Sequence, residues 1–387
     1  MSYAIVIIDG AADLPVIELD GQTPLAAARI PNMDSAAREG RCGMVRTVPE
    51  GFSPGSDVAI MSLLGYDPSR YYTGRAPLEA AAMGLHTEED EWIFRCNIVT
   101  IQDNIMIDYS AGNIPTEKAR ILIDSLNRRI KDPPARFHAG VGYRNLMTIK
   151  GDMGVVTTPP HDILDQPIPP YLPRGQGAES LISLIRQSET VFGELTNGAE
   201  RQPTSIWLWG QGKPTVMDPF KERYGLEGAV ITAVDLVRGI GRLIGWRILN
   251  VPGATGYFDT DYAAKGKAAI QALSTFELVC VHIEAPDEAG HEGNFRAKVK
   301  SLERIDEAIV GPLIEAMKSG SGNWRLCILP DHATPCSVRT HTVAPVPFCL
   351  AGTNVVRDRT ESFDENSILL LGSPAIHGHR LMSMILS

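Results

Sequence analysis

The chain has 387 residues, of which 44% are hydrophobic and 21% are charged, and its formal net charge is −10. A chain of this length and composition can bury a core and form one large domain or two moderate ones. The acidic balance and the lack of a basic tract argue against a nucleic-acid partner, and no apolar stretch is long enough to span a membrane.

The first segment predicts a core strand that ends at a carboxylate. Residues 4–8 are uniformly apolar and lead directly into Asp9 and Gly10. No basic segment precedes this apolar run, so we expect a structural strand here and not a secretion signal. Asp9 is therefore predicted to lie at the carboxyl end of a strand, where open α/β sheets bind their ligands.

Ser56 is predicted to begin a short helix. Pro54-Gly55 is a turn signal, the residues from 57 to 64 suit a helix, and Gly65 ends it. Serine at such a position is usually only an N-cap, and that is the plain interpretation. A hydroxyl at a helix N-terminus also feels the positive end of the helix dipole, and a divalent cation would favour its alkoxide form. Ser56 is thus also a candidate nucleophile.

The middle of the chain differs from the rest in its pattern of predicted elements and in its proline content. Strands are predicted at 91–100 and 104–109 and a helix at 116–130, followed by a proline-rich stretch that runs to Pro173. We expect a smaller α/β domain here that closes over a neighbouring cleft as a lid. The predicted division places residues 75–204 in this inserted domain and residues 1–74 and 205–387 in the core domain.

Strands and helices alternate through the rest of the chain. Apolar strand patterns at 246–251, 276–283 and 325–329 alternate with helical patterns at 233–244, 261–273 and 297–317. This alternation predicts the α/β class, with a mostly parallel sheet and helices on both faces.

Two acid-histidine pairs follow strands in this region. Asp287 and His291 are four residues apart, so a helical turn places them on one face, where they can share a cation. Asp331 and His332 come directly after the strand at 325–329, and His341 follows within the same polar loop. Each pair alone is a weak signal that surface residues also produce.

The combined donor set is more informative than any single pair. Carboxylates, imidazoles and one serine, without a cysteine, have the composition of a two-metal phosphoryl-transfer site. Oxygen ligands favour Mn²⁺ or Mg²⁺ and imidazoles favour Zn²⁺, while Co²⁺ also fits; we expect two divalent cations, with Mn²⁺ as first choice. The predicted ligands are Asp9, Ser56, Asp287, His291, Asp331, His332 and His341.

Other titratable residues are less informative. His282 alternates with core residues in its strand, so it either supports a metal ligand or is merely buried. The six cysteines show no paired spacing, which suits a reducing cytoplasm.

Over nearly its whole length the chain resembles the archaeal-type cofactor-independent phosphoglycerate mutases of the alkaline phosphatase superfamily. The resemblance is carried by ordered motifs: Ile8-Asp9-Gly10, the stretch PGSDVAIMSLLGYDP at 54–68, Arg75-Ala76-Pro77-Leu78-Glu79, Asp108 to Gly112, Trp207 to Gly212, Val251 to Gly256, Glu284 to Gly293 and Asp331-His332. It implies an alkaline-phosphatase-like core domain with an inserted lid.

The resemblance also implies an activity and a division of the ligands. Asp9, Ser56, Asp331 and His332 would hold one cation, and the remaining three ligands the other. Ser56 would take the phosphoryl group from 3-phosphoglycerate and return it to the 2-hydroxyl of glycerate through a phosphoserine intermediate. The substrate is thus a small phosphorylated molecule, and the oligomeric state is left open.

An anionic substrate also requires cationic side chains. Guanidinium groups suit phosphate and carboxylate, and a histidine can line the inner face of the lid. The candidates for substrate binding are Arg75, Arg144, His161, Lys213 and Arg238.

Three other functions use the same residues. A homoserine-kinase-like phosphotransferase of threonine synthesis would keep the metal site and change the acceptor. A phosphatase would pass the phosphoryl group to water. A metal-stabilised binding protein would have a closed site, which a serine beside the metal ligands argues against.

Overall fold

The computed structural model describes residues 1–195, 202–320 and 322–387. The chain divides into a larger unit, Met1–Tyr72 with Val216–Ser387, and a smaller unit, Thr73–Thr215. None of the helices in the described ranges is long and apolar enough to cross a membrane.

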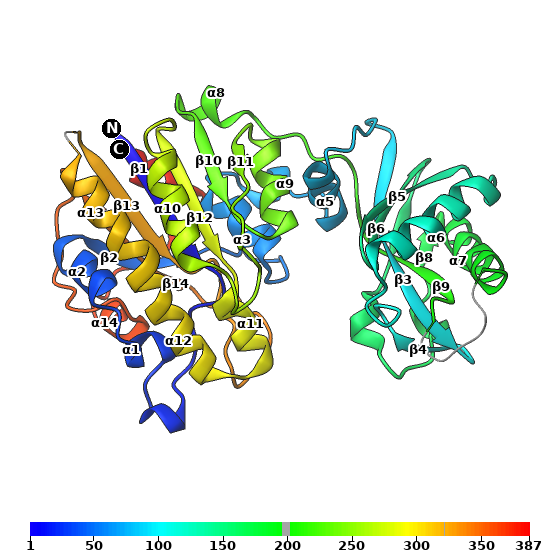
Figure 1. Cartoon of the computed structure of the whole chain (residues 1–387), viewed down its shortest axis with the longest axis horizontal. Helices are drawn as coiled ribbons and strands as arrows, with labels where there is room; N and C mark the ends of the chain where they lie inside the picture. The colour runs from blue at the N-terminus through cyan, green and yellow to red at the C-terminus, as the bar shows by residue number, and fades with distance from the viewer. Residues whose placement is uncertain (196–201, 321) are drawn as a thin grey trace. The chain divides into compact units, whose positions relative to one another are not determined.

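The larger unit is built on an eight-stranded sheet with the order β11-β10-β12-β1-β13-β14-β2-β15 (Figure 1). β14 is antiparallel to both neighbours, and the other neighbouring pairs are parallel. The strands are β1 (Ser2–Ile8), β2 (Arg41–Arg46), β10 (Gly228–Ile231), β11 (Arg247–Leu249), β12 (Leu278–Ile283), β13 (Trp324–Leu329), β14 (Val346–Gly352) and β15 (Ile376–His377). The predicted mostly parallel sheet is confirmed.

Helices cover this sheet because its central strands are apolar on both faces. Ala4, Val6 and Ile8 of β1 pack with side chains of α2, α10, α12 and α13, while Ile5 and Ile7 alternate to the opposite face and are equally buried. Figure 1 shows α10, α12 and α13 lying across one face. The helices are α1 (Pro24–Ala27), α2 (Pro31–Glu39), α3 (Ser56–Leu63), α4 (Pro68–Tyr71), α8 (Phe220–Tyr224), α9 (Asp235–Leu243), α10 (Tyr262–Ala272), α11 (Ala285–Glu292), α12 (Phe295–Ile305), α13 (Gly311–Ser319), α14 (Glu365–Leu369) and α15 (Gly378–Leu386), with a 3₁₀ turn at Ile17–Leu19 and a π turn at Asp306–Val310.

The described residues of the smaller unit form an antiparallel sheet with three helices. Its main sheet has the order β4-β3-β6-β5, and β9 pairs with the free edge of β3. Two short strands, β7 and β8, pair separately. The elements are β3 (Glu91–Gln102), β4 (Ile105–Asp108), β5 (Ala135–Val141), β6 (Arg144–Lys150), β7 (Gly154–Val156), β8 (Arg174–Gln176), β9 (Ser205–Gly212), α5 (Arg75–Met83), α6 (Thr116–Arg129) and α7 (Ala178–Gly193), with 3₁₀ turns at Pro160–Ile163 and Pro169–Tyr171.

The predicted domain boundaries need one correction. The sequence placed residues 205–215 in the core domain, but β9 pairs with β3 of the smaller unit over six residue positions from Ile93 to Val99. An apolar run does not reveal which sheet it joins, because the partner strand lies more than a hundred residues away in the chain. The predicted start at residue 75 lies beside the observed division at Thr73.

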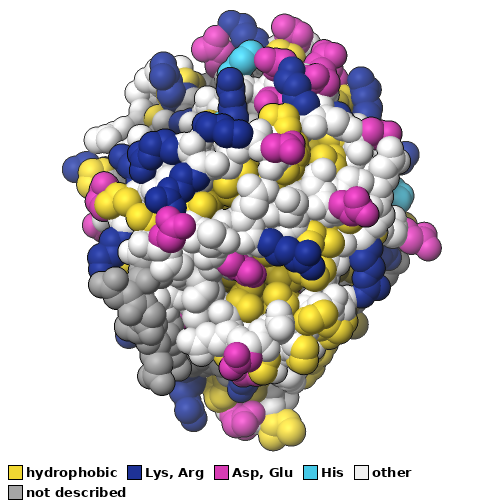
Figure 2. Space-filling view, turned by 90° about the vertical axis from the view of Figure 1, so that its right-hand side faces the viewer, with side chains coloured by type: hydrophobic (Ala, Val, Ile, Leu, Met, Phe, Trp, Pro, Cys, Tyr) yellow, Lys and Arg dark blue, Asp and Glu magenta, His cyan; other side chains and the backbone are white. Residues whose placement is uncertain are grey.

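On the face shown in Figure 2, several Lys and Arg side chains gather toward the upper left, acidic side chains are scattered, and hydrophobic side chains lie between them.

Gly65 ends α3, the helix that carries Ser56. Its φ of +90° lies in the left-handed region, which side chains with a Cβ rarely adopt. A Cβ at this position would lie 2.1 Å from the Tyr224 hydroxyl oxygen and 3.0 Å from the Met382 Cβ. Gly245 lies at the matching position after α9, with a φ of +80° and no heavy atom within 4 Å of its Cβ position.

We expect Gly65→Ala to destabilise the protein more than Gly245→Ala. Both variants bear the left-handed strain of about 1–2 kcal/mol, but only the first adds a steric clash, which typically costs about 1–3 kcal/mol. Urea unfolding of both variants measures the difference in the free energy of unfolding. Equal losses in the free energy of unfolding would show that glycine is needed at position 65 only for its left-handed backbone and not to avoid a clash with Tyr224.

Candidate metal centre

Three neighbouring parallel strands end at one place in the larger unit. β1 lies between β12 and β13 and is parallel to both, with Ile8 opposite Ile283 and Ile7 opposite Leu329. The segments that follow these strands therefore meet at one edge of the sheet. Asp9 follows β1, Asp287 lies in α11 directly after β12, and Asp331 follows β13.

The first group of donors is sealed from solvent. Asp9, His282 and Asp331 each supply a possible ligand atom, and these atoms lie within 4.8 Å of one another. Asp331 Oδ1 accepts from the backbone N–H groups of Gly10 (3.1 Å) and His332 (2.8 Å), which fixes the carboxylate. Asp9 Oδ1, His282 Nε2 and Asp331 Oδ2 are buried and make no hydrogen bond within the described ranges. Unpaired buried polar atoms of this kind are costly, and a bound cation would satisfy all three.

The second group of donors is partly open to solvent. Asp287 and His291 lie one helical turn apart in α11, with Asp287 Oδ2 3.2 Å from His291 Nε2. His341 Nε2 lies 3.5 Å from Asp287 Oδ1 and 3.0 Å from His291 Nε2. The side chains of His291 and His341 are 37% and 22% exposed, whereas that of Asp287 is 7% exposed. A small molecule can therefore reach this group from the histidine side.

Ser56 and His332 lie at the junction of the two groups. His332 Nε2 lies 3.1 Å from Ser56 Oγ, 3.3 Å from Asp331 Oδ2 and 3.6 Å from Asp9 Oδ1. His332 also groups with Asp287 and His341 as a possible ligand set. All seven residues predicted as ligands thus come together, although they are drawn from four separate segments of the chain.

The predicted capping role of Ser56 is wrong. Gly55 is the N-cap of α3 and Ser56 is its first helical residue. The Ser56 side chain caps no backbone group and instead faces His332. Gly55 has an extended backbone, and a Cβ there would lie 2.8 Å from Asp57 Oδ1. The glycine thus lets the chain enter the helix tightly and leaves the serine hydroxyl available for chemistry.

The electrostatics suit cations at both groups. Burial, reinforced by Asp331, Asp287 and Glu284, raises the pKa of Asp9 well above its usual range. Burial also lowers the pKa of His282 to about 4 and that of His332 below its ordinary value. The two buried imidazoles are therefore neutral at physiological pH, which is the form that binds metals.

In the second group, a proton on His291 occupies the position that a cation would take. The hydrogen bond to Asp287 raises the pKa of His291 to about 9. Burial opposes ionisation of Asp287, but hydrogen bonds from His291 and His341 hold its pKa well below the usual range. A cation at this group must displace the His291 proton before it can bind the imidazole.

Thr334 connects the two groups and was not anticipated from the sequence. Its hydroxyl donates to Asp287 Oδ1 (2.5 Å) and lies 3.2 Å from His332 Nδ1. The Thr334 carbonyl accepts from Lys298 Nζ (2.7 Å), and Lys298 in turn is paired with Asp13 (2.8 Å) in a fully buried contact. This chain of contacts holds the loop after β13 against α11 and α12. Only the short spacing from His332 could have drawn attention to Thr334.

The predicted substrate-binding residues are spread over both units. In the smaller unit Arg75 contacts Glu79 (3.4 Å), His161 lies with its ring centroid 5.3 Å from that of Trp209, and Arg144 stacks 5.4 Å from the Tyr143 ring. Lys213 donates to the backbone oxygen of Asp90 (3.2 Å). In the larger unit Arg238 donates to Asn250 (2.7 Å).

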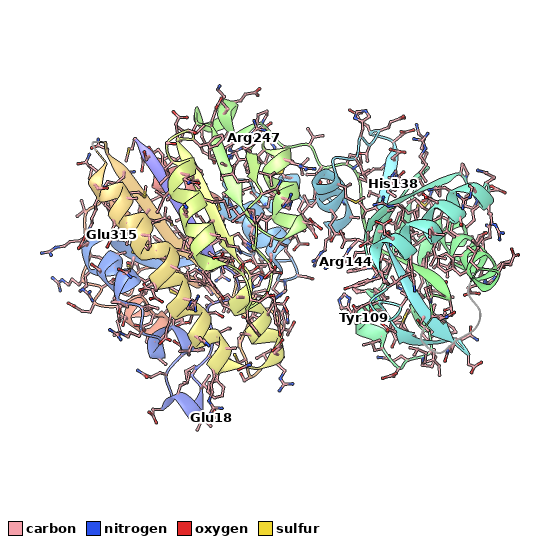
Figure 3. The ribbon with its side chains drawn as sticks, in the orientation of Figure 1. Glu18, Tyr109, His138, Arg144, Arg247 and Glu315 are labelled. Atoms are coloured by element: carbon pink, nitrogen blue, oxygen red, sulfur yellow. The ribbon has the colours of Figure 1, made fainter. Side chains whose placement is uncertain are left out.

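Arg95 joins this set although the sequence did not single it out. It is buried in β3, pairs with Glu79 at 2.9 Å and stacks 4.0 Å above the Trp209 ring. Arg75, Arg95 and His161 therefore gather around Glu79 and Trp209. Tyr109 and Arg144 lie on the same edge of the smaller unit (Figure 3), and the Tyr143 ring lies 5.8 Å from that of Tyr109.

Comparisons with known proteins agree on one family. A family model described as 2,3-bisphosphoglycerate-independent phosphoglycerate mutase matches residues 37–196. A protein of that name from Methanothrix thermoacetophila is 49% identical over the full length of both chains. Among solved structures, a protein from Pyrococcus horikoshii is 28% identical with a TM-score of 0.82, covering 100% of this chain and 96% of its own. The cofactor-independent phosphoglycerate mutase from Thermoplasma acidophilum is 25% identical with a TM-score of 0.68, covering 100% and 98%.

We expect Mn²⁺ affinity to rise with pH between 6 and 8 and binding to release protons. Below about pH 9 His291 carries a proton that the metal must displace, and the raised pKa of Asp9 adds to this competition. Titration calorimetry at pH 7 in buffers of different ionisation enthalpy measures the number of protons released. His291→Gln should release about one proton fewer. Binding that is independent of pH and of the buffer would contradict this assignment.

We expect Thr334→Val to weaken Mn²⁺ binding about 10-fold or more, because groups that orient metal ligands typically contribute that much. The matched control is Thr360→Val, since Thr360 is also buried but its hydroxyl makes no hydrogen bond within the described ranges. Equilibrium dialysis with both variants measures the effect. Equal Mn²⁺ affinity in the two variants would rule out an orienting role for Thr334.

Proposed function

This chain belongs to the 2,3-bisphosphoglycerate-independent phosphoglycerate mutases, and from that membership we propose how its own residues carry the reaction. The enzyme is an isomerase that interconverts 3-phosphoglycerate and 2-phosphoglycerate. Without a bisphosphoglycerate primer, the phosphoryl group must rest on the protein while it changes position on glycerate. One side chain has to accept it and give it back.

Ser56 is the side chain best suited to this task. It is the first residue of α3, so the N–H groups of the first turn and the helix dipole favour a phosphate at its hydroxyl. Its Oγ lies 3.1 Å from His332 Nε2, and Ser56 is partly exposed, whereas the carboxylates around it are buried. This contact between a partly exposed serine and the donor groups is the observation that carries the proposal.

The reaction then has two half-reactions on one hydroxyl. Ser56 Oγ loses its proton and attacks the phosphorus of 3-phosphoglycerate, the bond from phosphorus to O3 breaks, and O3 takes up a proton as glycerate leaves. After glycerate has reoriented, its 2-hydroxyl loses its proton and attacks the phosphoserine, the bond from phosphorus to Ser56 Oγ breaks, and Oγ takes up a proton. The second half-reaction is the first in reverse, with the 2-hydroxyl in place of O3, so the same side chains can serve both.

The donor groups fit two divalent cations. We assign Asp9, Asp331 and His332 with Ser56 to one, on the contacts of His332, and Asp287, His291 and His341 to the other. Mn²⁺ fits their mixed oxygen and nitrogen donors. When bound, such cations would neutralise the phosphoryl oxygens and lower the pKa of the Ser56 hydroxyl. The protein holds the donors ready through the backbone bonds to Asp331 and through Thr334.

The smaller unit is proposed to hold the anionic parts of the substrate. Arg75, Arg144 and His161 offer cationic or hydrogen-bonding groups near aromatic rings, and Arg95 holds Glu79 in place beside Arg75. Lys213 and Arg238 fit this role less well because each donates to a protein oxygen. The lid function of this unit stays a prediction.

A cytoplasmic location is likewise a proposal. All six cysteines are buried and none forms a disulfide. Free cysteines are typical of proteins in a reducing compartment such as the cytoplasm.

We expect Ser56→Ala to lower kcat by about 10⁴-fold or more, as loss of a catalytic nucleophile does, while Mn²⁺ binding persists. The assay follows conversion of 3-phosphoglycerate to 2-phosphoglycerate with Mn²⁺ present. The control is Ser62→Ala in the same helix, whose buried hydroxyl makes no hydrogen bond within the described ranges and which should keep its activity. A Ser56→Ala variant with full activity would remove Ser56 from the nucleophile role.

A further inference from the structure

His282 lies beside the predicted ligands but belongs to no motif that named them. It is the fifth residue of β12, opposite Ile7 of β1, and its side chain is completely buried. Its Nε2 lies 3.0 Å from Asp9 Oδ2, within the group that Asp331 completes. A polar ring buried this deeply needs a partner at each nitrogen.

The two ring nitrogens have different surroundings. His282 Nδ1 lies 3.2 Å from the Thr232 hydroxyl oxygen, which also accepts from the Val234 backbone N–H at 3.0 Å. His282 Nε2 makes no hydrogen bond within the described ranges, although Asp9 Oδ2 is near enough. The ring therefore does not aim an Nε2–H group at that carboxylate. This favours the tautomer in which Nδ1 donates to Thr232 and Nε2 keeps its lone pair.

The spacing of these atoms matches ligands of a shared cation. Two donors bound at about 2.1 Å to one metal lie roughly 3.0–3.4 Å apart at the angles of octahedral or tetrahedral coordination. The distance from His282 Nε2 to Asp9 Oδ2 is 3.0 Å. Asp9 Oδ1 and Asp331 Oδ2 are also buried and make no hydrogen bond within the described ranges, and Asp331 belongs to the same group of possible ligands.

We infer that His282 is a direct ligand, through Nε2, of the cation held by Asp9 and Asp331. The inference rests on the proposed function, since it requires that the site binds metal. Two carboxylates, one neutral imidazole and a divalent cation form a group without net charge, which suits its complete burial. The more open group has a single carboxylate, Asp287, so with its cation it is positive and attracts the phosphate of the substrate.

The assignment gives the buried cation a second imidazole. His332 keeps its place beside Asp331 (3.3 Å) and Asp9 (3.6 Å) and links them to Ser56 (3.1 Å). The division taken from the family motifs gave the buried cation His332 as its only imidazole.

The direct test is a crystal structure of the wild-type protein grown with Mn²⁺ and measured at the manganese absorption edge. The inference predicts an anomalous peak within about 2.3 Å of His282 Nε2, a normal metal–nitrogen distance. A peak bound by Asp9 and Asp331 but more than about 3.5 Å from His282 Nε2 would overturn it, and the proposed function would stand. Absence of any metal would overturn both.

A variant pair gives a second test in solution. His282→Gln keeps a polar side chain without the imidazole, and His138→Gln is the control, because His138 also bonds a threonine (Thr148, 3.1 Å) but lies in the smaller unit. Mn²⁺ content after equilibrium dialysis should fall from two ions to one in the first variant and stay at two in the second. Two ions retained at unchanged affinity in a folded His282→Gln protein would contradict direct ligation.

If His282→Gln does not fold, His282→Asn replaces it, with folding checked by circular dichroism without metal. The thermal midpoint with and without Mn²⁺ separates ligation from support of the fold. A ligand predicts that the stabilisation by Mn²⁺ shrinks, whereas a purely structural residue lowers both midpoints equally and would refute the inference.

Discussion

The parallel alignment of β12, β1 and β13 is the constraint on which the site depends. Because these strands are neighbours and run in the same direction, the residues that follow them must meet at one edge of the sheet. Asp9, Asp287 and Asp331 come together from three distant segments for this reason. A slip of one residue in any of the three strands would turn its terminal side chains to the other face and remove a donor.

Bringing these carboxylates together creates an electrostatic cost that the protein relieves for Asp287, through His291 and His341, but not for Asp9. Asp9, Asp287 and Asp331 are buried close to one another, and burial with the neighbouring acids raises the pKa of Glu284 to about 8 as well. Buried charges of one sign are normally neutralised or paired. The cations Lys298 and Lys265 do not form ion pairs with these three aspartates: Lys298 pairs with Asp13, and Lys265 donates to backbone oxygens. A site with this imbalance is organised around metal ions, and chemistry on an anionic phosphate follows from their charge.

The candidate ligands that the sequence pointed to most directly are those with a local signal. Asp9 and Asp331 each end an apolar strand, and Asp287 and His291 have helical spacing, so short patterns sufficed to find them. His282 was harder because a histidine inside a buried strand has the same pattern whether it binds a metal or only packs. Arg95 was missed because an arginine in a strand usually faces solvent, and only its pairing with Glu79 and Trp209 explains its burial. The membership of β9 depends on pairing across a hundred residues, which no local pattern contains.

The central claim is that Ser56 carries the phosphoryl group between the two positions on glycerate. The most direct measurement is peptide mass spectrometry of the Mn²⁺-loaded enzyme, mixed with 3-phosphoglycerate and quenched in acid during turnover. The account predicts one added phosphoryl group on the peptide that contains Ser56, located on that serine by fragmentation. Turnover with that peptide unmodified, or with the phosphoryl group on another side chain, would contradict it.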